Sequence, residues 1–206
     1  LIHALAALRG RYIPKDELAA QAINMEQDII KENVGSQDQI SAAFGGFNRI
    51  DFKRNDTFQV SPIILAKDRL HEFQSHLMLC FTGFSRIASE VAKSKIENFK
   101  SREAELHRMK EMVDEAIMIL QNPRTSIDEV GRLLHESWLC KRSLSDRVST
   151  PEIDQLYEEA GRVGALGGEN CRASRRRRLS AVVCEAGVAI KSSRATEAFG
   201  ACAVPV

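Results

Sequence analysis

The feature that most constrains the fold is a short segment from Gly35 to Gly46, which begins with one glycine and ends with a pair. The residues between them predict a single helix of about two to three turns. Ser36 followed three residues later by Gln39 is a capping-box pattern, and Gly45 is typical of a helix end with positive φ. This pattern places Asp38 in the first turn, where backbone N–H groups and the helix dipole favour an ionised carboxylate.

An aspartate held at the beginning of a helix has two common uses. It can act as a general base or orient a nucleophilic hydroxyl group. Acidic residues are also frequent in first turns for purely structural reasons. The segment by itself leaves both uses of Asp38 open, and the frequency of the structural use favours the second.

Several segments, in chain order, carry a resemblance to a known family. They are Gly35–Gln39 with Ala42–Asn48, Phe81–Glu90, Leu134–Lys141, and Gly164–Gly168. Together they resemble the GHMP small-molecule kinases, a superfamily that includes galactokinase, mevalonate kinase and homoserine kinase. Within it, the chain is most similar to the sugar kinases typified by D-glycero-α-D-manno-heptose 7-phosphate kinase, over about residues 1–168.

The resemblance implies phosphorylation of a hydroxyl group on a sugar or sugar phosphate, with ATP and Mg²⁺ as cofactors. In the family, the aspartate that matches Asp38 is catalytic. The other site residues that it implies are Thr82, Gly83, Arg86, Trp138 and Lys141 on the substrate side, and Gly35 and Ser36 on the cofactor side.

Each substrate-side residue also has an ordinary structural use. The guanidinium of Arg86 matches the geometry of a phosphate group, but Thr82 and Ser85 can simply satisfy backbone groups at a strand-to-helix corner. Trp138 can stack on a sugar, although burial is the commoner use of a large aromatic ring. No partner His or Cys lies at metal spacing from His135, so we expect a packed or surface histidine there.

The amino-acid composition limits the classes of binding partner and the cellular compartment that we expect. The 206 residues carry 29 basic and 28 acidic side chains, a balance that argues against nucleic acid or a membrane surface as a partner. No apolar run approaches the length of about 18 residues that a membrane span needs, and the first residues lack the basic leader of a signal peptide. The five scattered cysteines fit a reducing cytoplasm. The sugar, its anomer and the oligomeric state stay open.

The periodicity predicts an α+β fold. We expect helices near residues 1–8, 15–31, 67–74, 87–121, 127–144 and 151–163, and strands near 47–52, 58–65 and 76–82. The resemblance implies a truncated two-domain fold of the GHMP-kinase type: residues 1–70 complete an amino-terminal domain, and residues 71–168 form a helix-rich domain on a small antiparallel sheet.

Residues 169–206 differ in character from the rest, with no convincing period and with four arginines at Arg175–Arg178. Such a run is typical of a nucleic-acid or targeting patch. The family expects a glycine-rich loop and an apolar strand here, and arginine codons read one base along encode glycine. We therefore predict a frame-shifted, disordered tail.

A non-catalytic role is the alternative function. Residues 1–34 contain no glycine-rich phosphate loop, and the chain begins at Leu1 within a helical pattern, which indicates a missing beginning. An inactive remnant of a kinase, or a helical interaction module built from one, accounts for both observations.

Overall fold

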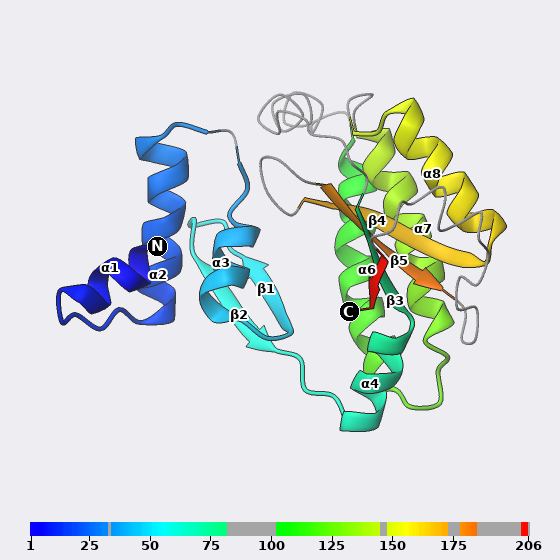
Figure 1. Ribbon diagram of the computed structural model, residues 1–206, viewed down its shortest axis with the longest axis horizontal. Helices are drawn as coiled ribbons and strands as arrows, with labels where there is room; N and C mark the ends of the chain where they lie inside the picture. Colours follow the sequence, from blue (N-terminus) through cyan, green and yellow to red (C-terminus); the bar gives the residue numbers. More distant parts are fainter. Residues whose placement is uncertain (33, 82–101, 145–147, 173–177, 185–202, 206) are drawn as a thin grey trace. The chain divides into compact units, whose positions relative to one another are not determined.

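The computed structural model describes residues 1–32, 34–81, 102–144, 148–172, 178–184 and 203–205. The described residues divide into two compact units, Leu1–Ile64 (unit 1) and Leu65 onward (unit 2). The two units divide after Ile64, and the predicted domain boundary near residue 70 stays a prediction. Figure 1 shows the helices and strands of each unit.

Unit 1 is a helical segment followed by a helix and a hairpin. Its elements are α1 (Ile2–Leu8), α2 (Lys15–Asn24), the π-helix η1 (Met25–Ile29), α3 (Gln37–Phe44), β1 (Asn48–Phe52) and β2 (Phe58–Pro62). The helix predicted over 15–31 is therefore α2 continued by a π-helical turn, in which the N–H of Ile30 donates to the carbonyl of Met25 at 3.0 Å.

Unit 1 has a small core where α2 packs on α3. Ala19 and Ile40 are fully buried there, and Lys15 Nζ donates to the carbonyl of Phe44 at 2.7 Å. Gly45 ends α3 with φ 62°, so the predicted positive-φ stop is confirmed. The chain then enters the antiparallel β1–β2 hairpin, with Ile50 opposite Val60.

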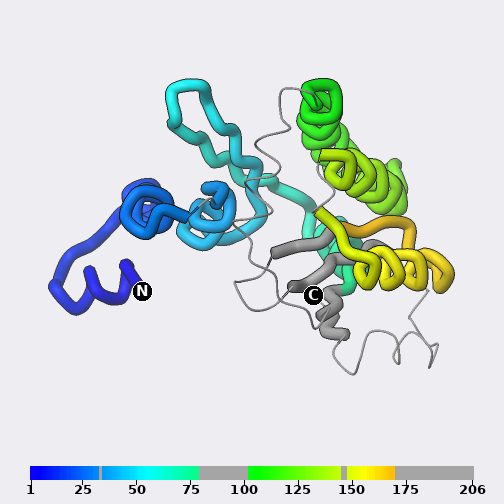
Figure 2. The backbone as a smooth tube through the Cα atoms, turned by 90° about the horizontal axis from the view of Figure 1, so that it is seen from above, coloured from blue at the N-terminus to red at the C-terminus, as the bar shows by residue number. Residues whose placement is uncertain are grey.

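Unit 2 is a helix-rich layer on a four-stranded antiparallel sheet. Its elements are α4 (Lys67–Ser75), β3 (Leu77–Phe81), α6 (Glu103–Gln121), α7 (Asp128–Ser143), α8 (Pro151–Arg162), β4 (Ala165–Arg172), β5 (Arg178–Cys184) and β6 (Ala203–Pro205). The strand order is β4-β5-β3-β6. Helices α7 and α8 contact β4, and α6 packs on α7. Figure 2 shows β4 in orange beside α8 in yellow. The predicted α+β class is confirmed.

The core of unit 2 forms around the α6–α7 pair and the beginning of α8. Leu120, Ile127 and Val130 form one cluster, and Trp138, Val148 and Ile153 form another. Leu139, next to Trp138 on α7, is 50% exposed. Helix α8 begins with a side-chain cap, because the Thr150 hydroxyl accepts from the Ile153 N–H at 3.3 Å and Pro151 is the first helical residue.

Arg69 of α4 links two parts of unit 2. The side chain is only 7% exposed, and its guanidinium group donates to four carbonyls at the carboxyl end of α6 and in the following turn. These belong to Ile119, Leu120, Asn122 and Thr125. A cation at a helix carboxyl terminus satisfies carbonyls that have no partner within the helix and opposes the negative end of the dipole.

Part of the segment 169–206 lies in strands, and the disorder of this tail stays a prediction. The end of β4, β5 and β6 all lie within residues 169–206, and β5 pairs with β4 on one side and with β3 on the other. Leu179–Cys184 is a short run rich in valine, which suits a strand, and the backbone groups of β3 and β4 offer it partners. Backbone pairing does not depend on the coding frame, so the frame shift stays a prediction.

None of the described helices is both long enough and apolar enough to cross a lipid bilayer.

Candidate active site

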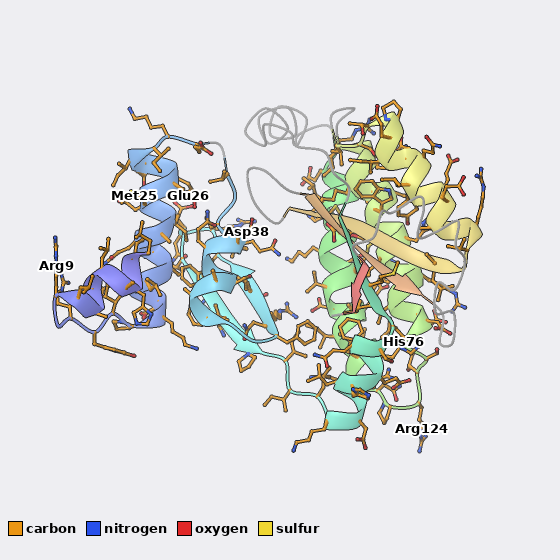
Figure 3. The ribbon with its side chains drawn as sticks, in the orientation of Figure 1. Arg9, Met25, Glu26, Asp38, His76 and Arg124 are labelled. Carbon is orange, nitrogen blue, oxygen red and sulfur yellow. The ribbon has the colours of Figure 1, made fainter. Side chains whose placement is uncertain are left out.

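Asp38 lies in the first turn of α3, as predicted. It is exposed, and no other described residue forms a hydrogen bond or ion pair with its carboxylate. Figure 3 labels Asp38 on α3 and Glu26 on the preceding π-helix. A carboxylate that is exposed and has no partner among the described residues can, in chemical terms, take a proton from a bound hydroxyl group.

The predicted capping box is wrong. Ser36 has helical backbone angles, φ −97° and ψ −5°, and its side chain does not cap the helix. A capping residue needs an extended backbone to turn its oxygen towards the next N–H groups. The Gln39 amide does not reach back to Ser36 either, because Gln39 Nε2 donates to Glu26 Oε2 at 2.8 Å.

Gln27 of η1 contacts the segment that leads into α3. Its amide nitrogen donates to the carbonyl of Val34 at 2.9 Å and to the Ser36 hydroxyl at 3.2 Å. Neighbouring residues of η1, Glu26 and Gln27, therefore hold the entrance to α3 on both sides of Asp38. Neither residue was predicted from the sequence, because their contacts join residues 7 to 13 positions apart. Capping patterns relate residues within one helical turn.

The cofactor-side positions lie at the same corner. Gly35 is exposed, and a Cβ added to it would meet no atom within 4 Å, so the backbone there is open to a ligand. Ser36 Oγ already accepts a hydrogen bond from Gln27. Thr82, Gly83 and Arg86 lie outside the described residues.

Trp138 is not available to a sugar in this structure. Its side chain is 1% exposed, and its ring stacks on that of Tyr157 with 5.9 Å between centroids. The alternative use, burial in the core, is the one observed. Lys141 forms an ion pair with Glu169, and His135 Nδ1 lies 2.7 Å from the Tyr157 hydroxyl. Burial raises the pKa of Tyr157, an effect opposed by a hydrogen bond with the Gly168 backbone.

The described residues were compared with the side chains that ATP and Mg²⁺ need. They contain no group of three or more His, Cys, Asp or Glu side chains placed to hold a metal ion. The segment 1–34 contains a single glycine, Gly10, so it cannot form the glycine-rich loop that cradles phosphates at a helix amino terminus. Around the first turn of α3, the chemically useful group is the exposed Asp38 carboxylate, which can accept a proton.

Comparison with known sequences identifies relatives, although no family model matches the chain. The chain is 30% identical over 175 residues to D-glycero-alpha-D-manno-heptose 7-phosphate kinase of Campylobacter jejuni, covering 82% of this chain and 50% of that protein. It is 24% identical over 154 residues to the bifunctional fucokinase/GDP-fucose pyrophosphorylase of Arabidopsis thaliana, covering 69% of this chain and 14% of that protein. The chain thus spans about half the length of the heptose kinase.

Solved structures show the same fold. A D-glycero-D-manno-heptose 1-phosphate kinase from Bacteroides thetaiotaomicron matches with a TM-score of 0.69 at 20% identity, over 99% of this chain and 56% of that one. The L. major mevalonate kinase in complex with R-mevalonate matches with a TM-score of 0.61 at 17% identity, over 95% of this chain and 56% of that one.

Proposed function

Because this chain is a homologue of the sugar kinases of the GHMP superfamily over about half of their length, we propose that it acts in phosphoryl transfer from ATP to a hydroxyl group of a sugar or sugar phosphate. A heptose 7-phosphate is the acceptor that the similarity to the Campylobacter enzyme favours. The observation that carries the proposal is Asp38 in the first turn of α3, which is exposed and has no hydrogen-bond or ion-pair partner in the part of the chain that the structure describes.

Asp38 is the general base in this proposal. Its carboxylate takes the proton of the acceptor hydroxyl group as that oxygen becomes the nucleophile. Catalysis of such a transfer depends on positioning and on charge stabilisation more than on covalent chemistry. A carboxylate on a short helix whose amino-terminal corner is tied to η1 provides the positioning on the acceptor side.

The remaining residues of the site are part of the same proposal. Thr82, Gly83 and Arg86 bind the substrate, with Arg86 on a phosphate group, and Gly35 and Ser36 lie beside the cofactor. ATP and Mg²⁺ are the cofactors, and a cytoplasmic location follows from the cysteine usage. Lys141 is a weaker substrate contact, since Glu169 already neutralises it.

The second candidate function is non-catalytic, that of a helical interaction module. Residues 1–34 contain no glycine-rich phosphate loop. Loss of one fixed donor at a transition-state charge costs roughly 100- to 1,000-fold in rate. We therefore expect the 206-residue chain alone to release no ADP in a sugar-dependent manner and to bind ATP poorly by calorimetry.

A chimera separates the two functions. Residues 1–168 are joined to the part of the Campylobacter kinase that they do not match, and ADP release is measured with heptose 7-phosphate and other sugar phosphates. We expect Asp38→Asn to lower kcat by about 100- to 10,000-fold, the usual contribution of a general base, with little change in the KM for ATP.

The matched control is Asp16→Asn, which alters an exposed aspartate in the first turn of α2 in the same unit. Turnover at the parent level in Asp38→Asn would refute the catalytic role. A folded chimera without turnover would favour the non-catalytic module, and sugar-dependent ADP release by the 206-residue chain alone would show that the donor side needs nothing more.

A further inference from the structure

We propose that η1 positions the catalytic base, with Gln39, Glu26 and Gln27 as positioning residues for Asp38. This inference rests on the proposed role of Asp38. It adds that the orientation of the first turn of α3 is set by the π-helical turn before it and not by a helix cap.

The π-helical geometry of η1 determines which way Glu26 and Gln27 extend. A π-turn closes its hydrogen bond over five residues, as the Ile30 N–H does with the Met25 carbonyl at 3.0 Å. The wider turn brings consecutive side chains closer to one direction than an α-helix does. Glu26 and Gln27, neighbours in sequence, accordingly both reach the segment around Asp38.

Glu26 and Gln27 contact different parts of the segment around Asp38. Gln27 binds the chain before α3, through the Val34 carbonyl and the Ser36 hydroxyl. Glu26 binds the first turn itself, through Gln39. Asp38 lies between Ser36 and Gln39, so the two contacts hold the backbone on either side of it.

The Gln39 side chain is 8% exposed, and its Oε1 is buried without a hydrogen-bond partner among the described residues. Turning the amide over would place that oxygen against the Glu26 carboxylate, where the two would repel each other. An unsatisfied buried oxygen is costly and is kept where a site requires it. The hydrogen bond with Glu26 therefore fixes the orientation of the Gln39 side-chain amide.

Ser36 makes no side-chain cap to α3, so the first turn lacks the usual local restraint. The contacts from η1 replace it. Displacement of a catalytic group by about 1 Å can cost 100-fold in rate, so the restraint has a direct use in a kinase. π-Turns are frequent at functional sites.

Hydrogen exchange of the full 206-residue chain tests the proposal without relying on activity. In Gln39→Leu, which keeps the bulk of the side chain, we expect the amides of residues 37–44 to exchange about tenfold faster. The amides of α6 and α7 should be unchanged. The matched control is Gln21→Leu, because Gln21 donates to Glu17 at 2.8 Å on the exposed side of α2.

Exchanging the two residues of the Glu26–Gln39 hydrogen bond gives a second test. The double variant Glu26→Gln with Gln39→Glu restores one amide–carboxylate hydrogen bond with the partners exchanged, and we expect it to recover most of the lost protection. Exchange in Gln39→Leu within roughly twofold of the parent would overturn the proposal, as would failure of the exchanged pair to recover protection while the chain stays folded.

The chimera adds a readout of catalysis. There we expect Gln39→Leu to lower kcat about 10- to 100-fold with the sugar KM and the Tm nearly unchanged. A fall in Tm with kcat preserved would mean that Gln39 is only structural and would overturn the proposal. If Asp38→Asn proves harmless, the proposed function fails, whereas the exchange results still show whether η1 restrains α3.

Discussion

The two units hold themselves together by different means. In unit 2, large side chains such as Trp138, Ile127 and Leu120 are almost completely buried. In unit 1, the fully buried side chains are Ala19 and Ile40, and many large apolar residues are exposed. The most exposed of these are Leu1, Leu8, Tyr12, Ile29 and Ile64.

The difference shows how each unit fixes its geometry. A two-stranded hairpin with a few short helices buries little apolar surface, and packing alone stabilises such a unit only weakly. Unit 1 therefore depends on specific polar contacts, such as Gln39 with Glu26 and Lys15 with the Phe44 carbonyl. Asp38 lies in this weakly packed unit, where local opening requires less free energy than in a large core.

The largest effect that this comparison predicts is at Trp138. Trp138→Ala should destabilise unit 2 by about 3–5 kcal/mol, the usual loss for a buried tryptophan. Tyr12→Ala, a matched aromatic truncation in unit 1, should change stability by no more than about 0.5 kcal/mol, because Tyr12 is 82% exposed.

Exchange of the α7 amides in increasing urea measures the stability of unit 2 separately, since a chain of two units need not unfold in one step. Equal effects of the two truncations would show that the burial difference does not govern stability.

The second effect is at the contact between β4 and α7. A Cβ on Gly167 would lie 2.0 Å from the Gly131 carbonyl oxygen and 2.6 Å from the His135 backbone nitrogen, and neither backbone atom can move aside by a rotamer change. Gly167→Ala should therefore destabilise unit 2 by about 1–3 kcal/mol or more.

The control is Gly35→Ala in unit 1, where an added Cβ meets nothing within 4 Å. Thermal unfolding of the two variants makes the comparison. A neutral Gly167→Ala would mean that β4 can move away from α7 without loss.

The smallest effect is on the ion pairs between α6 and α7. Arg108 Nε donates to Glu136 Oε1 at 2.6 Å, and this hydrogen bond lowers the pKa of the Glu136 carboxyl group, against a smaller opposing effect of burial. A lowered pKa means that Glu136 stabilises the folded chain above its unfolded pKa, and that this contribution is lost as the pH falls through its folded pKa.

Glu136→Gln should thus lower the Tm slightly at neutral pH, by less than Gly167→Ala does, and the difference should shrink in acid and in high salt. In unit 1, Asp51→Asn breaks an ion pair within a single strand, with Arg49, and should change the Tm less. A Tm difference for Glu136→Gln that grows in acid would contradict the sign of this effect.

The sequence by itself determined the local features of this protein. The first-turn position of Asp38, the stop at Gly45 and the cap at Thr150 were all predictable. Each depends on residues within one helical turn of one another, so the pattern of polar, apolar and glycine residues contains the information. The helices and the hairpin followed for the same reason.

Only the tertiary structure decided the contacts between distant residues. Glu26 and not Ser36 became the partner of Gln39, because Ser36 took helical backbone angles and η1 brought a carboxylate near. Likewise, Gly167 meets Gly131 across a helix–strand contact, and β5 pairs between β3 and β4. Such contacts depend on where the folded chain brings its segments together, and no periodicity in the sequence encodes that distance.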